Sequence, residues 1–127
     1  MLVRPRRKRT VRRGGISDKT VRFLTEQQPP TPCLVVDLEV VADAYKMLRH
    51  YLPLAKVFYA IKANPAREIL AMLDQMGSSF DVASPGEIDM CLHLGVTADR
   101  ISFGNTIKKE RDIAYAFKNG VRLFAFD

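Results

Sequence analysis

Lys62 is the residue of this sequence best placed for chemistry, because it directly follows the apolar run Val57-Phe58-Tyr59-Ala60-Ile61. A run of this kind is typical of a strand covered on both faces. Since alternate side chains of a strand share a face, Ala60 and Lys62 are expected to point one way and Ile61 the other. An amine held behind apolar residues is partly removed from water, which favours the neutral form that condensation with a carbonyl requires. The same position also suits a lysine that caps a strand and reaches solvent, so the pattern permits a Schiff-base lysine without selecting it.

Polar side chains also follow the other expected strands: Asp81 with Ser84, Asn105, and Asp127. In a parallel sheet the carboxyl ends of the strands meet at one edge, where active sites lie. The two cysteines, at positions 33 and 91, stand far apart in neither a metal-binding nor a C-x-x-C spacing. No metal site is expected, and such sparse cysteine usage fits a reducing cytoplasm.

The elements that must position these groups form a repeat. Strands are expected at residues 57–61, 79–83, 100–103 and 121–126, and helices at 66–76, 84–95 and 107–118. The strands recur about every 22 residues with a helix between each pair, which predicts right-handed βαβ units and a parallel sheet. Ser84-Pro85-Gly86-Glu87 has the form of a capping box with proline at the first helical position, so Glu87 is expected first as a cap. Ahead of the repeat we expect a proline-rich lead-in, a short buried strand at 33–36 and a helix at 38–51.

Two architectures accept this pattern, an open doubly wound sheet and a (β/α)8 barrel. The barrel is favoured because every strand ends in a polar group and no glycine-rich phosphate loop is present. A barrel of eight strands typically takes about 250 residues. The chain is therefore expected to be an N-terminal fragment with about four of the eight strands, in preference to a complete four-stranded domain.

The formal net charge of +6 is concentrated in a leader. Residues 1–22 hold nine Lys or Arg against one acid, and the remainder holds eleven bases against thirteen acids. The body therefore carries no basic stripe for nucleic acid. We expect residues 1–28 to be a disordered basic leader, with an organelle-targeting leader or a mis-assigned start codon as alternatives. Residues 29–53 are then a lead-in strand and helix, and 54–127 the first βα units. No apolar run reaches the ~20 residues of a membrane helix, so a soluble protein is expected.

Four blocks of sequence, in order over roughly residues 30–127, resemble the PLP (pyridoxal 5′-phosphate) enzymes of the alanine-racemase fold. Residues 58–65, FYAIKANP, are similar to the cofactor-lysine segment Y-A-x-K-A/C-N that follows the first barrel strand. Residues 77–87, GSSFDVASPGE, resemble the block G-x-x-F-D-V/C-A-S-x-x-E. Residues 105–108, NTIK, resemble the N-P-x-K turn with threonine in place of proline, and residues 31–37, TPCLVVD, resemble the opening T-P-x-x-V-x-D. The wording F-D-V-A-S is most similar to ornithine decarboxylases and their lysine-active relatives.

The resemblance implies a PLP-dependent decarboxylase that converts L-ornithine to putrescine in polyamine biosynthesis. Diaminopimelate or lysine as substrate, or a non-catalytic homologue that acts as a binding protein, are the alternatives. Lys62 is implied as the lysine that holds PLP, and Asp81 as a carboxylate that faces the cofactor and positions Lys62. Ala60 would form the floor beneath the ring, the glutamate matching Glu87 lies close to the site, and Asn105 is a weaker candidate.

The resemblance also implies parts beyond these blocks. The histidine that stacks on the ring, the phosphate loop and the acidic partner of the pyridinium nitrogen come from later barrel strands. Substrate contacts come from a C-terminal β-domain, to which the strand at 33–36 would belong, in part across a homodimer interface. We therefore expect a cytoplasmic homodimer for the full-length protein, with no nucleic-acid or membrane partner, and no activity for this chain alone. The small PLP-homeostasis protein of the same fold is disfavoured by residues 31–37.

Overall fold

The computed structural model describes residues 16–127, which fall into two compact units that divide after Val40. The first unit holds helix α1 (Asp18–Gln27) and the start of helix α2 (Leu38–Tyr51). The second unit holds the rest of α2 and a repeat of strands and helices. Within the described residues no helix is long and apolar enough to cross a bilayer.

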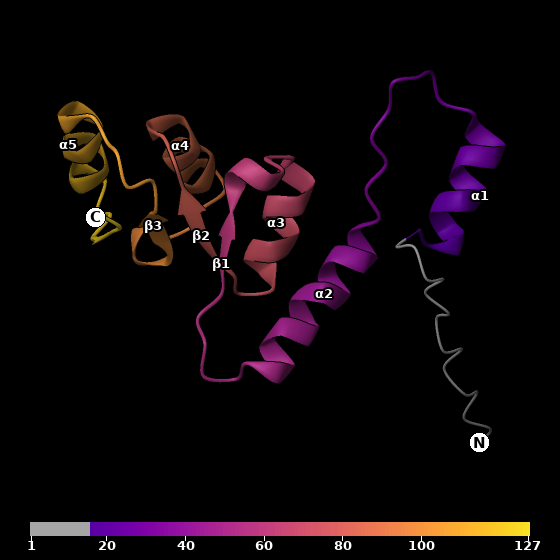
Figure 1. Ribbon diagram of the computed structural model, residues 1–127, viewed down its shortest axis with the longest axis horizontal. Helices are drawn as coiled ribbons and strands as arrows, with labels where there is room; N and C mark the ends of the chain where they lie inside the picture. The colour runs from indigo at the N-terminus through magenta and orange to yellow at the C-terminus, as the bar shows by residue number, and fades with distance from the viewer. Residues whose placement is uncertain (1–15) are drawn as a thin grey trace. The chain divides into compact units, whose positions relative to one another are not determined.

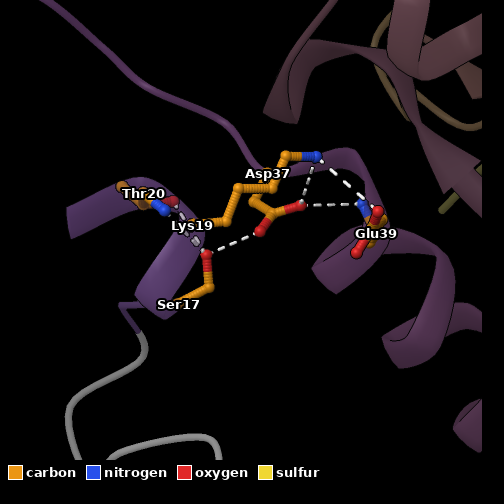
Figure 2. A network of polar contacts seen from close by, with 5 residues as sticks. All are labelled: Ser17, Lys19, Thr20, Asp37 and Glu39. Carbon is orange, nitrogen blue, oxygen red and sulfur yellow. Dashed lines mark hydrogen bonds and ion pairs between the residues drawn. The ribbon is translucent and has the colours of Figure 1, made fainter. Parts of the chain in front are cut away.

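Helix α1 forms within the segment for which a disordered leader was predicted. Ser17 is its N-cap and accepts a hydrogen bond from the Thr20 amide at 3.1 Å. The Ser17 hydroxyl also donates to Asp37 Oδ2 at 2.6 Å, and Asp37 Oδ1 accepts from the Glu39 amide at 3.0 Å (Figure 2). Residues 18–27 of the predicted leader are therefore helical in the structure, where a cap and a partner twenty residues away stabilise the helix. Residues 1–15 of the predicted leader lie outside the described residues.

The short strand expected at residues 33–36 does not form. No residue of this segment is assigned to a strand, and Leu34 is 81% exposed. An apolar run becomes a strand only when a neighbouring strand pairs with its backbone groups. Among the described strands none pairs with this segment.

The second unit is built on a four-stranded parallel sheet. Strands β1 (Phe58–Ala60), β2 (Ser79–Val82), β3 (Ile101–Phe103) and β4 (Leu123–Phe124) lie side by side in chain order. Helices α3 (Arg67–Gln75), α4 (Pro85–His93) and α5 (Glu110–Lys118) connect them and follow one another along the sheet in the same order (Figure 1). A doubly wound sheet reverses its strand order at a switch point. The described strands show no such reversal, and the predicted run of about four parallel barrel strands is confirmed.

One face of the sheet makes the core with the helices. Most of its inward side chains are 1% exposed or less, as are several apolar residues of α3 and α4: Ile61, Phe80, Val82, Ile101, Phe103, Leu70, Ile88 and Cys91. Tyr59 and Phe124, on the two outer strands, are half-buried. The alternate residues of the strands lie on the other face, where Ser79 is buried at 2% exposure but the others are half-buried or, like Leu123 at 52%, exposed. The apolar runs therefore supply one buried face against the helices, and the opposite face stays open in the described chain.

The strands and helices of the repeat are shorter than their patterns predicted, whereas α2 has the expected bounds. A single 3-10 turn, η1 (Ile61–Ala63), replaces the end of the first strand, and a second, η2 (Ala98–Arg100), precedes β3. Helix α5 begins at Glu110, three residues later than expected, and β4 is only two residues long. Strand β4 pairs only with β3 among the described strands, so few ladder bonds extend it. Gly77, the expected glycine after α3, has a φ of 81°, a conformation that glycine adopts without strain.

Candidate active site

The site is built on a row of three residues across the open face of the sheet. Ala60 of β1 is the register partner of Asp81 of β2, and Asp81 is the partner of Ser102 of β3. Register partners in a parallel sheet point to the same face, and all three are half-buried. The structure therefore brings together two of the predicted site residues, Ala60 and Asp81, one strand apart.

Lys62 lies beyond the end of β1, within the turn η1. Its neighbour Ile61 is fully buried and Lys62 itself is exposed. Both lie in the turn η1, so the strand alternation from which the orientation of Lys62 was predicted ends before them. The partial removal of Lys62 from water that the sequence predicted is not present. The side chain of Lys62 is exposed, so its amine is accessible to a ligand.

The loop after Lys62 is held by two residues of the same sequence block. The Tyr59 hydroxyl donates to the Asn64 carbonyl at 3.1 Å, and the Asn64 side-chain oxygen accepts from the Ala66 amide at 3.1 Å. Burial raises the pKa of Tyr59, and the bond to the Asn64 carbonyl opposes that shift. Tyr59 and Asn64 thus fix the turn that carries the lysine, a role that the sequence block did not reveal.

Asp81 lies against the backbone that follows β3. A Cβ atom added to Gly104 would lie 2.5 Å from Oδ2 and 2.6 Å from Cγ of Asp81, and closer still to Oδ1. A side chain at position 104 would therefore require the Asp81 carboxylate to move. Gly104 was missed from the sequence, because its meaning depends on the pairing of β2 with β3. In the sequence, Gly104 was marked only by its position directly before the block at residues 105–108.

Glu87 is confirmed as a helix cap. The Ser84 hydroxyl accepts from the Glu87 amide at 3.3 Å, and Glu87 Oε2 accepts from the Ala83 amide at 2.6 Å. The carboxylate therefore reaches back to the residue before the N-cap, directly after β2. These bonds stabilise the start of α4 and the end of β2 together.

Asn105 is exposed, and its side-chain amide donates to the Ile107 carbonyl at 2.8 Å. This bond shapes the loop after β3, so Asn105 has a structural task where the sequence suggested a weaker site candidate. Lys108 of the same block donates to the Ala125 carbonyl, and its Nζ lies 5.3 Å from the centroid of the Phe103 ring. Lys108 thereby ties the loop after β3 to the end of β4.

The resulting site offers an accessible amine, a half-buried carboxylate and a small side chain at one end of a parallel sheet. An accessible amine suits an aldehyde cofactor, and Ala60 leaves space on the open face beside it. These donors fit PLP. In residues 16–127 no cluster of three or more His, Cys, Asp or Glu side chains could hold a metal ion.

Comparison with known proteins decides the family. Residues 38–127 match the pyridoxal binding domain of the pyridoxal-dependent decarboxylases. The chain belongs to this decarboxylase family. The lysine/ornithine decarboxylase of Selenomonas ruminantium is 44% identical over 112 residues, which are 88% of this chain and 28% of that protein.

Solved structures agree with this assignment to the decarboxylase family. The lysine decarboxylase of Selenomonas ruminantium, solved in complex with PLP and cadaverine, has a TM-score of 0.76 at 44% identity, over 88% of this chain and 29% of that one. A lysine/ornithine decarboxylase from Vibrio vulnificus complexed with putrescine has a TM-score of 0.79 at 30% identity, over 88% and 31% of the two chains. The chain thus spans less than a third of these decarboxylases.

Proposed function

We propose that this chain supplies the cofactor lysine of a PLP-dependent decarboxylase that acts on basic amino acids. The observation that carries the proposal is the place of Lys62. It is an exposed amine in the turn that follows the first strand of a pyridoxal binding domain, and that strand ends at Ala60, the register partner of Asp81. A non-catalytic homologue has no need of a lysine and a carboxylate at these two strand ends.

Each residue of the site then has a separate task. Lys62 binds the cofactor through its amine, and Ala60 leaves room for the ring on the open face. Asp81, the register partner of Ala60 on the open face, is the carboxylate that orients Lys62 toward the cofactor. Glu87 keeps the end of β2 in place through the Ala83 amide. When bound, the cofactor itself supplies the electron sink that stabilises the carbanion left by the loss of CO2.

The proposed substrate is L-ornithine, with putrescine as the product and a place in polyamine synthesis. Support comes from the lysine/ornithine decarboxylases among the relatives, and from the putrescine and cadaverine bound in the solved structures. Lysine and diaminopimelate are the competing substrates, because the described site residues act on the amino-acid core that all three share. We further propose a cytoplasmic homodimer for the whole protein.

Borohydride trapping tests the role of Lys62. The longer protein that contains this chain, loaded with PLP, is expected to absorb near 420 nm, and reduction should attach the cofactor to the peptide that carries residue 62. Lys62→Arg should abolish both signals. Lys118→Arg, on an exposed position of α5, should leave both unchanged.

Label on another lysine, or colour that survives Lys62→Arg, would show that the assignment is wrong. CO2 release from ornithine, lysine and diaminopimelate, measured side by side, then decides the substrate. If CO2 were released faster from lysine or diaminopimelate than from ornithine, that amino acid would take the place of ornithine as the proposed substrate.

A further inference from the structure

The turn that carries Lys62 is bridged by a hydrogen bond. The turn is η1 (Ile61–Ala63), and the Tyr59 hydroxyl ahead of it donates to the Asn64 carbonyl behind it at 3.1 Å. Ile61, the first residue of the turn, is fully buried. The backbone around Lys62 is therefore restrained on both sides, by a buried neighbour before it and by the bridge to Tyr59 after it.

Asn64 connects this bridge to helix α3. Its side-chain oxygen accepts from the amide of Ala66, the N-cap of α3, at 3.1 Å. The Ala66 carbonyl accepts in turn from the amides of Ile69 and Leu70 at 3.0 and 3.1 Å. Both of these side chains are buried in the core. The carbonyl that receives the Tyr59 hydroxyl thus belongs to a residue anchored on the first turn of a packed helix.

Tyr59 makes the bridge from the face of the sheet that packs on the helices. Its register partner is Phe80, which is fully buried, whereas the next pair along the strands, Ala60 and Asp81, lies on the open face. Tyr59 therefore acts on Lys62 through the backbone of the turn and not from the open face. Burial raises the pKa of Tyr59, so its hydroxyl keeps its proton and remains a donor at neutral pH.

We propose that Tyr59 is a positioning residue for capture of the cofactor, because its hydroxyl holds the turn η1 in the arrangement from which Lys62 binds PLP. The inference rests on the proposed function, in which Lys62 binds the cofactor. A bond to the cofactor fixes the Lys62 amine at one place, and a turn that is already restrained loses less conformational freedom when that bond forms. Without the hydroxyl, the turn samples other arrangements, and PLP binding has to order it.

Tyr59→Phe tests this role in the longer protein that contains this chain, because it removes the hydroxyl and keeps the ring. The dissociation constant for PLP should rise by about fivefold, equal to ~1 kcal/mol, which is the usual contribution of one hydrogen bond. Borohydride should still label residue 62 when PLP is saturating, because the lysine itself is unchanged.

Tyr115→Phe is the matched control. It also removes one hydroxyl bond, which runs from α5 to the Asp89 carboxylate in α4. Thermal unfolding of the apo proteins measures what each lost hydroxyl does to the fold, and Tyr115→Phe should bind PLP like the parent whatever its Tm. Equal PLP dissociation constants for Tyr59→Phe and Tyr115→Phe would overturn the inference.

A second pair of variants tests the anchor of the bridge and covers the case in which Tyr59→Phe does not fold. Asn64→Ala removes the acceptor for the Ala66 amide, whereas Asn64→Ser supplies a neutral oxygen that can accept the same bond. Asn64→Ala should bind PLP more weakly than the parent, and Asn64→Ser should recover part of that loss. PLP binding by Asn64→Ala that matches the parent would refute the anchored bridge.

Failure of the proposed function is recognised separately, because borohydride would then not label Lys62 in the parent protein. Labelled Lys62 together with unchanged PLP binding in Tyr59→Phe would reject the Tyr59 inference alone.

Discussion

Arg100 joins three elements at the end of the sheet opposite the site, and its removal should cost stability. Its Nη2 lies 2.9 Å from Asp74 Oδ1 in α3, its Nε donates to the Ser78 carbonyl at 3.2 Å, and Nη2 also donates to the Asp74 carbonyl at 3.3 Å. Ser78 is fully buried, and the side chains of Arg100 and Asp74 are only 26% and 24% exposed. Arg100→Met keeps the aliphatic stem and removes every one of these bonds.

The expected loss follows from these contacts. A hydrogen bond to a charged group contributes about 1.5–3 kcal/mol, and a buried acceptor left without a donor costs about 1–3 kcal/mol. With discounting for partial exposure, Arg100→Met should lower the free energy of unfolding by about 3 kcal/mol. For a chain of this size that corresponds to a fall in Tm of roughly 10 °C.

Thermal and urea unfolding followed by circular dichroism measure the loss. Arg111→Met is the matched control, because its side chain is 77% exposed and pairs only with the adjacent Asp112 at 3.5 Å. That control should change stability by less than about 0.5 kcal/mol. Equal losses for the two variants would refute the assignment of Arg100 as a link between α3, β2 and β3.

Two further predictions concern the cap of α1 and the buried thiol. Ser17→Ala removes the N-cap and the bond to Asp37, so protection of the α1 amides from hydrogen exchange should fall by about 1 kcal/mol. Thr25→Ala is the control, because it loses only an exposed bond to the helix backbone. Equal protection in the two variants would contradict the capping role of Ser17. Burial raises the pKa of Cys91 to about 12, helped by the nearby carboxylates, so iodoacetamide at pH 8.5 should label Cys33 and spare Cys91. Because the folded thiol keeps its proton to higher pH than the unfolded one, the free energy of unfolding should also fall between about pH 9 and pH 12. Cys91→Ala should lack this fall, and a parent protein with the same pH dependence as Cys91→Ala over that range would count against the raised pKa.

The repeat of strands and helices could be predicted because its signals are local. Runs such as residues 57–61 are apolar on both faces, and the capping box at Ser84 marks a helix start within four residues. The same local signals placed Lys62 and Asp81 at strand ends. The parallel order of the strands then followed from the helix between each pair, because a helical crossover returns the chain to the same end of the sheet.

The features that were missed depend on partners far along the chain. Helix α1 is capped by Ser17, whose hydroxyl also bonds to Asp37, a residue that no pattern links to it. The segment 33–36 has the composition of a strand but no strand pairs with it among the described residues. Gly104 acquires its meaning only when β3 is placed beside β2, and the exposure of Lys62 only when the open face is seen.

The two hydrogen bonds of Glu87 have a consequence for evolution at this position. Its backbone amide donates to the Ser84 hydroxyl at the start of α4, a bond that any residue but proline could make, while its carboxylate accepts from the Ala83 amide directly after β2. A change in the charge or reach of this side chain would lose the second bond and loosen the scaffold. Divergence in substrate preference is therefore expected to accumulate at neighbours that have a single task, and position 87 should vary little among functional descendants of this protein.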